Sequence, residues 1–244
     1  MKKLLSKLAL FAAVLFAAAS CGEVPPGVDG PIDNSGPLFK ITATTSAYSR
    51  ATDTAFEVGD AISVFASKGS VVLPEGATAQ EMMDALANLS VWIDNGKFTK
   101  GESGFSGDKE YKWYEGEEKS QIFAFYPYNE KWATTDVLLH GVNFCVQTDQ
   151  TTHKGYTASD LMFASLTDVA PTEESVQLAF GHLLSKIVVD VKNERTDKVV
   201  AAYVDGVQGN YLFEFPQYSA TGDRGTIRAG ELATPTEGYT NSMC

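Results

Sequence analysis

The feature that most constrains the fold of this chain is an alternation of side chains over residues 176–182. Val176, Leu178 and Phe180 occupy every second position, with polar or small residues between them. Successive side chains of a β-strand point to opposite faces of a sheet, whereas a helix brings together residues three or four apart. The alternation therefore predicts a strand with one face buried in the core.

A second alternation follows after a short break. Ile187, Val189 and Val191 again stand at every second position. β-branched side chains favour strands, because they fit the pleated, half-buried surface of a sheet. We therefore expect two core strands that are joined near residues 181–186.

The same stretch places His182, Ser185 and Lys186 close together, a combination that also occurs in hydrolases. Catalytic groups must be brought together from separate elements, and the sequence contains no nucleophile elbow, no zinc-protease motif and no phosphate-binding loop. We therefore predict no enzyme activity, no catalytic residue and no cofactor. His182 is expected to hydrogen-bond a backbone group at the end of a strand.

Three other segments have strand patterns. Residues 38–48 and 142–146 alternate, while residues 121–128 form a continuous apolar run. Such a short run is typical of a central strand buried on both faces, and Pro127 should end it. Cys145 lies inside an apolar strand, so we expect it to be buried and unreactive.

Local signals place turns and a helix between the strands. Gly59-Asp60 is predicted to form a turn that starts a strand, with Phe56 packed beneath it. A Thr-x-x-Glu capping box at Thr78 predicts a helix over residues 78–89. Residues 91–99 are interpreted as a hairpin that turns at an Asn-Gly pair.

Together these patterns predict a mostly β fold. We expect a Greek-key-like antiparallel β-sandwich with one short helix, followed by an incomplete second β module. The sandwich is expected to span residues 38–192 and the partial second domain residues 193–244, where the strand patterns are weaker. Residues 234–244 are polar and have no strand pattern.

The beginning of the chain has the features of a signal peptide, predicted here over residues 1–20. Lysines precede an apolar run that is shorter than the roughly 20 residues of a membrane-spanning helix. Small residues lead directly to Cys21, as at a lipoprotein cleavage site, so Cys21 is the predicted lipidation site. Residues 21–37 are rich in glycine and proline and are expected to form a lipid-anchored tether.

Charge and cysteine content exclude two classes of function. The formal net charge is −12, and such an acidic surface repels the phosphates of nucleic acids. The chain has no Cys-x-x-Cys pair and no spaced set of histidines and cysteines, so we predict no metal site.

Several motifs occur together in one order. Phe56-x-x-Gly-Asp comes first, then Phe-Ala-Phe-Tyr-Pro-Tyr from Phe123 and the pair Asp149-Gln150. Asp160-Leu-Met-Phe-Ala follows, and then Phe180-x-His-Leu-Leu-Ser-Lys. One of these motifs alone would be a weak signal, but their joint order resembles the fimbrillin (Mfa-like) family. Its members are lipoprotein subunits of type V pili and their relatives.

The resemblance implies a structural or accessory pilus subunit that acts in cell adhesion. It would be lipid-anchored in the outer membrane and exposed at the surface, or part of a fimbrium. In polymerising fimbrillins a trypsin-like protease cuts after an arginine that follows the first strand, and Arg50-Ala51 is the matching bond here. A strand from another pilus subunit then replaces the released strand, which here would be residues 38–48. The polar residues 234–244 would bury little area, so we expect this chain to accept a strand rather than donate one.

A rival interpretation is a surface lipoprotein that binds a glycan or another ligand. Five aromatic side chains motivate it, because an amphipathic ring can offer both an apolar face and a polar group. They are Trp113, Tyr114, Tyr126, Tyr128 and Trp132. An exposed cluster would favour this interpretation, and burial in the core would count against it.

Overall fold

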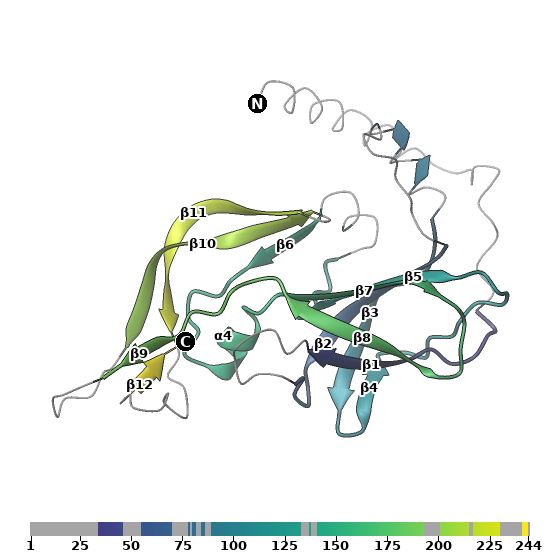
Figure 1. The fold of residues 1–244 in the computed structure, drawn as a ribbon, viewed down its shortest axis with the longest axis horizontal. Coiled ribbons are helices and arrows are strands. Elements are labelled where there is room, and N and C mark those ends of the chain that lie inside the picture. The colour runs from purple at the N-terminus through teal and green to yellow at the C-terminus, as the bar shows by residue number, and fades with distance from the viewer. Residues whose placement is uncertain are drawn as a thin grey trace.

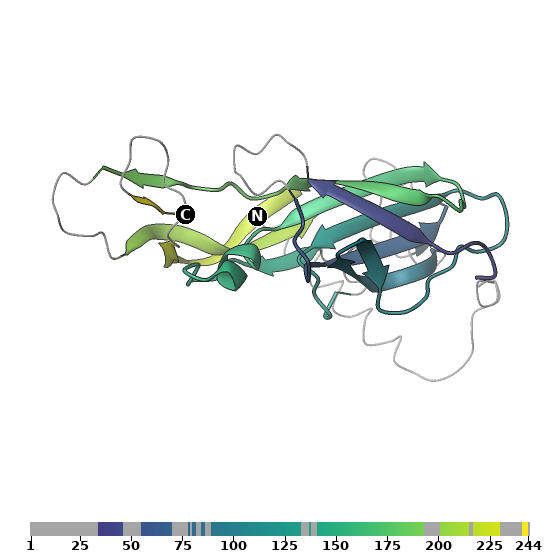
Figure 2. The same cartoon turned by 90° about the horizontal axis from the view of Figure 1, so that it is seen from below.

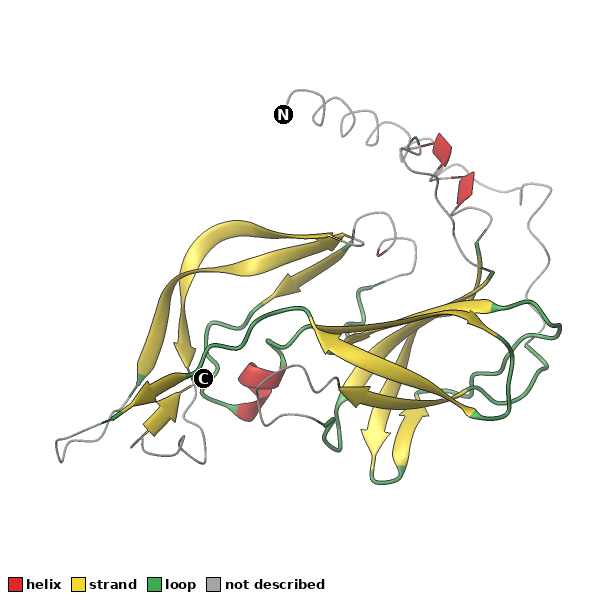
Figure 3. Cartoon of the chain, viewed as in Figure 1, coloured by secondary structure: helices red, strands yellow, loops and turns green. Residues whose placement is uncertain are grey.

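The computed structural model describes residues 34–45, 55–69, 78, 80–81, 84–85, 89–132, 137, 141–192, 201–214, 217–229 and 241–243. Within these residues the chain forms one sheet of seven strands, one of three and one of two (Figure 1). Figure 3 shows that helix is confined to short segments between the strands. The mostly β fold predicted from the sequence is confirmed.

The seven-stranded sheet is mixed rather than purely antiparallel. Its strands are β1 (Lys40–Thr45), β2 (Ala61–Lys68), β3 (Ser90–Gly101), β4 (Gly104–Gly107), β5 (Ser120–Tyr126), β7 (Met162–Val169) and β8 (Ser175–His182). They stand in the order β1-β8-β7-β5-β2-β3-β4. Neighbouring strands are antiparallel, except that β1 runs parallel to β8. Figure 2 shows β1 in purple beside β8 in green.

The two edges of this sheet come together, so that it nearly closes on itself. The residues just before β1 pair antiparallel with the segment that follows β4. The backbone N–H of Phe39 donates to the carbonyl of Tyr111, and the N–H of Trp113 donates to the carbonyl of Pro37, each at 2.9 Å. The chain around β1 is therefore bonded on both sides.

Two smaller sheets make up the rest of the described structure. β6 (Val142–Cys145), β10 (Ala202–Glu214) and β11 (Gln217–Ala229) are antiparallel, in the order β11-β10-β6. β9 (Val189–Val191) pairs with β12 (Asn241–Met243). In Figure 1 the large sheet and the smaller sheets lie at opposite ends, with α4 (His153–Thr157) between them. The domain division after residue 192 stays a prediction, and β6 pairs with β10 across it.

Two apolar clusters share the middle strands of the large sheet. The first fills the inside of the nearly closed sheet and includes Ile122 and Phe180. The second lies between the large sheet and the three-stranded sheet, where Phe125 packs with Phe144, and Tyr211 contacts the cluster. β5 supplies side chains to both clusters, so it is buried on both faces, as its continuous apolar run predicts.

Several local predictions are also confirmed. β8 alternates between exposed and buried residues as far as Phe180, and β5 ends at the residue before Pro127. At the capping box, the backbone N–H of Thr78 donates to Glu81 at 2.7 Å and the N–H of Glu81 donates to Thr78 at 3.2 Å. The helix predicted over residues 78–89 is described at six positions, and the four inner ones (80, 81, 84 and 85) are helical.

The prediction of a second core strand over residues 187–191 is wrong. β9 is only three residues long, and Ile187 is 56% exposed. Its partner is β12, a short strand within residues 234–244, where the sequence has no strand pattern. The β-branched pattern correctly indicates an extended backbone. The segment is not buried, however, because it does not join the large sheet.

The predicted hairpin over residues 91–99 is also wrong. β3 continues straight through Asn95 and Gly96, and the pairing with β2 shifts register there. Asn95 has a φ of 49°, so the pair forms a β-bulge instead of a turn. A Cβ atom at Gly96 would lie 2.7 Å from the Ile93 side chain and 2.9 Å from the hydroxyl of Tyr111, so any larger residue would force these side chains to move.

Cys145 is exposed rather than buried. In β6 the buried positions are Val142 and Phe144, so the alternation places Cys145 on the outer face. The prediction that Cys145 is buried is therefore wrong, because it relied on the apolar character of the strand. The alternation along the strand correctly places Cys145 on the exposed face.

Candidate functional site

The element that distinguishes this fold is β1, which fills a groove at the seam of the large sheet. Phe39 and Ile41 are each only 4% exposed, and Ala43 is partly buried against the same cluster. Lys40 and Thr42, between them, are exposed. One face of the segment is thus part of the first cluster, and the other face points to solvent. We call the space occupied by residues 36–45 the β1 groove.

Phe39 is held in a cage of three aromatic rings. Its ring centroid lies 5.1 Å from that of Trp92, 5.9 Å from that of Phe98 and 5.2 Å from that of Trp113. All three contacts are edge-to-face, with interplanar angles of 81° to 89°. This is a favoured geometry for aromatic pairs, because the positive edge of one ring meets the negative face of another.

Gly36 marks the point where the β1 segment comes closest to its neighbour. Its N–H donates to the carbonyl of Trp113 at 2.9 Å. A Cβ atom at this position would lie 2.6 Å from that same carbonyl oxygen. Since the obstacle is backbone and not a flexible side chain, the close pairing requires glycine.

On its other side, β1 pairs in register with the whole first part of β8. Lys40 stands opposite Ser175 and Thr45 opposite Phe180. The Lys40 ammonium also donates to the carbonyl of Glu173 at 3.2 Å. The strand therefore completes the hydrogen bonding of β8 on that edge, and its removal would leave that edge unpaired.

The chain downstream of β1 is anchored separately. Phe56 packs edge-to-face against Phe105, Tyr126 and Phe180, with centroids 5.2 to 5.5 Å apart. Gly59, with a φ of 101°, makes the turn that leads into β2, as the Gly-Asp pair predicts. Residues from Phe56 onward are therefore held without help from β1.

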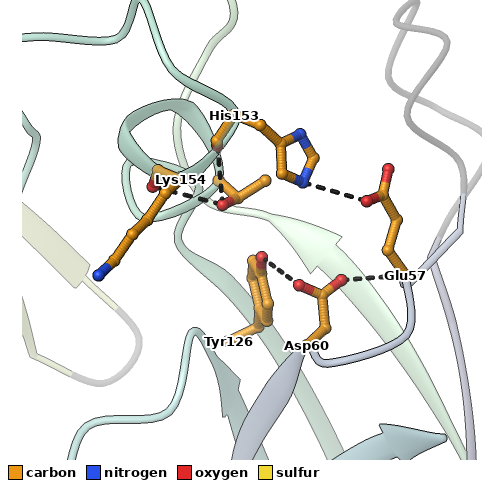
Figure 4. Close-up of polar contacts among 6 residues, drawn as sticks. Glu57, Asp60, Tyr126, His153 and Lys154 are labelled. Atoms are coloured by element: carbon orange, nitrogen blue, oxygen red, sulfur yellow. Dashed lines mark hydrogen bonds and ion pairs between the residues drawn. The ribbon is translucent and has the colours of Figure 1, made fainter.

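Polar contacts support this anchor (Figure 4). The Tyr126 hydroxyl donates to Asp60 at 3.1 Å, and the backbone N–H of Glu57 donates to the other oxygen of Asp60 at 2.8 Å. Burial raises the pKa of Tyr126, and the negative charge of Asp60 raises it further, so the hydroxyl stays neutral and can donate. His153, at the start of α4, lies 3.1 Å from the Glu57 carboxylate.

The predicted site residues are not among those that the structure describes. Cys21, Arg50 and Ala51 lie outside the described residues. Their roles stay predictions. What the structure does describe is the two sides of the predicted cleavage point: β1 before it and the Phe56 anchor after it.

A cavity of about 370 Å³ lies where the large sheet meets the smaller sheets. Its lining is mostly apolar and includes Leu183, Val204 and Ile227. His182 and Asp160 also line it, and the Nδ1 atom of His182 lies 2.7 Å from an Asp160 oxygen. The predicted backbone partner of His182 is therefore wrong, because the partner is a carboxylate.

His182 and Ser185 do not form a catalytic pair in this structure. Ser185 is exposed, and no hydrogen bond joins it to His182, although both residues are described. Within the described part of the chain, no three histidine, cysteine, aspartate or glutamate side chains lie where they could hold a metal ion. We find no helix among the described residues that is long and apolar enough to cross a membrane.

The aromatic residues that motivated the glycan-binding interpretation are buried. Trp113 and Tyr114 are at most 2% exposed, while Tyr126 and Trp132 are at most 8% exposed. Tyr128 is partly buried. Because these rings belong to the core, they offer no open stacking surface, and this interpretation loses its basis.

Sequence reasoning missed two features of the site. It did not find that the residues before β1 pair with Tyr111–Trp113, since no local pattern encodes a partner so far along the chain. It also missed the pairing of Asp160 with His182, although both lie in the motifs that the resemblance singled out. The available signal was an aspartate in one motif and a histidine in the next, which together could have suggested a pair.

Comparisons with known proteins give a consistent result. The sequence profile of the family described as "Fimbrillin-like" matches residues 49–239. A crystal structure of a proposed cell adhesion protein from Bacteroides ovatus is 19% identical, with a TM-score of 0.55 over 86% of this chain and 77% of that one. Another, from Bacteroides uniformis, is also 19% identical, with a TM-score of 0.50 over 84% and 73% of the two chains. None of the curated proteins compared with the chain matches it significantly. The two structures support the fold.

Proposed function

Because the chain belongs to the fimbrillin-like family, we propose that it is a structural or accessory subunit of a surface pilus, assembled by exchange of its first strand. β1 would be released after cleavage at Arg50-Ala51, and a strand from another pilus subunit would fill the β1 groove. Lipid on Cys21 would anchor the chain to the outer membrane before release. Family membership is the premise, and the position of β1 supports the exchange.

The single observation that carries the proposal is that β1 is an edge strand whose inner face fills a groove in the core. Its buried side chains are Phe39 and Ile41, and burial of each stabilises by roughly 1.5–3 kcal/mol. Without them the first cluster would be open to water along one side. The exposed groove and the unpaired edge of β8 would then favour any extended segment that restores both.

The position of the predicted cleavage point supports release rather than unfolding. Arg50 lies between β1 and the Phe56 anchor in the sequence. A cut there would separate β1 from the remainder, while the aromatic contacts of Phe56 and the polar contacts in Figure 4 keep the start of β2 in place. The strand before the cut would leave without disturbing β2.

A locked strand tests the proposal. Thr42 and Gln177 stand opposite each other on exposed positions of β1 and β8, so cysteines there can form a disulfide. In a background where Cys21, Cys145 and Cys244 are serine, we expect a trypsin-like protease to cut at Arg50 in both the oxidised and the reduced protein. Only the reduced protein should then form complexes with a pilus subunit that supplies a strand.

Size-exclusion chromatography with light scattering measures complex formation, and N-terminal sequencing identifies the cut. The reduced form of the same variant is the matched control. Assembly of the oxidised, locked protein at the same rate would show that β1 does not leave, which would contradict exchange. An Arg50→Ala chain should remain uncut at this bond and unassembled.

The anchor has its own test. A Cys21→Ala chain should be lost from the membrane fraction, whereas the unaltered chain should carry a lipid that intact-mass analysis detects. Equal membrane association of the two chains would contradict the anchor without touching the exchange mechanism.

A further inference from the structure

We propose that the β1 groove recognises a defined sequence signature: glycine, then an aromatic residue three positions later, then an aliphatic residue two positions after that. The partner is an extended segment with this signature from another protein. The inference rests on the proposed function, since it specifies what can replace β1. Gly36, Phe39 and Ile41 are the three positions that carry it.

The aromatic position is read by the cage around Phe39. Three rings meet this side chain edge-to-face with centroids within 5.9 Å. An aliphatic side chain in the same place would lose these ring contacts and fill the space less well. Phe39 is almost fully buried, so water cannot make up the difference.

The glycine position is read by backbone. At Gly36 any side chain would place its Cβ atom 2.6 Å from the carbonyl oxygen of Trp113. The N–H of Gly36 donates to that same oxygen, so the two backbones cannot separate without losing the bond. Real Cβ atoms do not approach an oxygen so closely, and the groove therefore discriminates against every residue except glycine there.

The outward-facing positions are not read in this way, and Ala43 is only partly buried against the first cluster. Lys40, Thr42 and Thr44 point to solvent, and their side chains can vary. Ile41, in contrast, is 4% exposed within the first cluster. The signature is therefore sparse, with three fixed positions within six residues, and the backbone pairing on both sides of the segment adds affinity without adding selectivity.

The sequence itself limits which segments qualify. Apart from Gly36-x-x-Phe39-x-Ile41, only Gly141-x-x-Phe144-x-Val146 has this spacing in the chain. That second segment is already engaged, because Phe144 and Val146 are buried in the second cluster and β6 is paired with β10. Residues 230–244 contain no such spacing. Under the proposed function, the occupant is a segment with this signature from another pilus subunit.

Peptide exchange tests this inference. The full chain carries a site-specific protease site within residues 46–54, and the cut removes the covalent link between β1 and the rest of the fold, so that a peptide can displace it. Fluorescent peptides of residues 34–45 then compete for the groove, and fluorescence anisotropy gives their Kd values. The variants are Phe39→Leu and Gly36→Ala, with Lys40→Ser as the matched control at an exposed position.

We expect the Lys40→Ser peptide to bind within about twofold of the unaltered peptide, and the Phe39→Leu and Gly36→Ala peptides to bind at least about tenfold more weakly. Equal Kd values for all four peptides would overturn the signature while leaving strand exchange intact. If no peptide replaces β1 after the cut, the proposed function fails instead.

If the proposed function fails in this way, the thermal stability of the uncut chain still tests the signature. Phe39→Leu and Gly36→Ala should each lower its Tm, and Lys40→Ser should leave it unchanged. Unchanged Tm values for the first two variants would show that the groove does not select these side chains.

Discussion

The large sheet and the smaller sheets differ in how completely they bury their apolar side chains. The large sheet curls until its edges meet, and β1 fills the seam, so side chains such as Trp113 and Phe180 are completely buried. At the smaller sheets, Ile187 is 56% exposed and Tyr203 is 62% exposed. A mostly apolar cavity of about 370 Å³ lies beside them.

The difference between the two regions shows what encloses an apolar cluster in this fold. The first cluster is enclosed because β1, which is distant in sequence from its partner β8, fills the seam of the sheet. The smaller sheets have no equivalent strand among the described residues, and some of their apolar side chains, such as Val189 and Tyr203, stay open to solvent. Stability should therefore be concentrated in the large sheet, and five substitutions can test that.

The largest effect is expected at Trp113. Trp113→Ala removes a fully buried side chain that contacts both Phe39 and Trp92, and should lower the free energy of unfolding by about 4 kcal/mol. Tyr203→Ala, at an exposed position of β10, is the control and should change it by less than about 0.5 kcal/mol. Urea denaturation followed by tryptophan fluorescence or circular dichroism measures both. Similar losses for the two variants would show that stability is not concentrated in the large sheet.

A smaller effect is expected where the two regions meet. Asp160→Asn leaves the shape of the side chain but removes its charge beside His182, whose side chain is 16% exposed. We expect a loss of about 2 kcal/mol, because a largely buried histidine would lose a charged hydrogen-bond partner. The same denaturation measurement decides it, and a loss under about 0.5 kcal/mol would show that this pair contributes little to stability at the boundary between the regions.

The exposed pair next to the Phe56 anchor provides a matched contrast. Glu57→Gln removes a charge from the contact with His153, whose side chain is 63% exposed. Exposed ion pairs contribute little, so we expect a change below about 0.5 kcal/mol. If Glu57→Gln cost as much as Asp160→Asn, burial would not be what separates the two pairs.

The smallest effect on stability is expected at Ile187. Ile187→Ser replaces an exposed aliphatic side chain and should leave the free energy of unfolding within about 0.5 kcal/mol of the original. It should still reduce the binding of an apolar fluorescent dye, because the side chain lines the cavity at the smaller sheets. A marked loss of stability would mean that this side chain is part of a core.

The sequence predicts the parts of the fold that depend on neighbouring residues. The alternation in β8, the double burial of β5, the turn at Gly59 and the capping box at Thr78 all follow from short patterns. Each needs only information within one strand or one turn. The mostly β class follows from the number of such strands.

The rest depends on contacts that short patterns do not encode. Asn95-Gly96 has the chemistry of a hairpin turn, yet the same positive φ serves a bulge, and only the long pairing with β2 decides between them. The alternation of residues 38–48 indicates a strand but neither its parallel partner nor its place in a seam. The cage around Phe39 is assembled from β3 and the segment after β4, both distant from Phe39 in the sequence, so no local motif could have revealed it.

The pairing of β1 with β8 also determines the order in which the protein can fold. Lys40 and the Glu173 carbonyl that it contacts are 133 residues apart, so the first strand to be synthesised must wait for one of the last strands of its sheet. Closing so long a loop is slow and costs chain entropy, whereas β2, β3 and β5 can find one another much earlier. We therefore expect the six other strands to pair before β1 docks in the seam. If β1 docks last, the species that precedes it during folding has the same open seam that the proposed strand exchange requires.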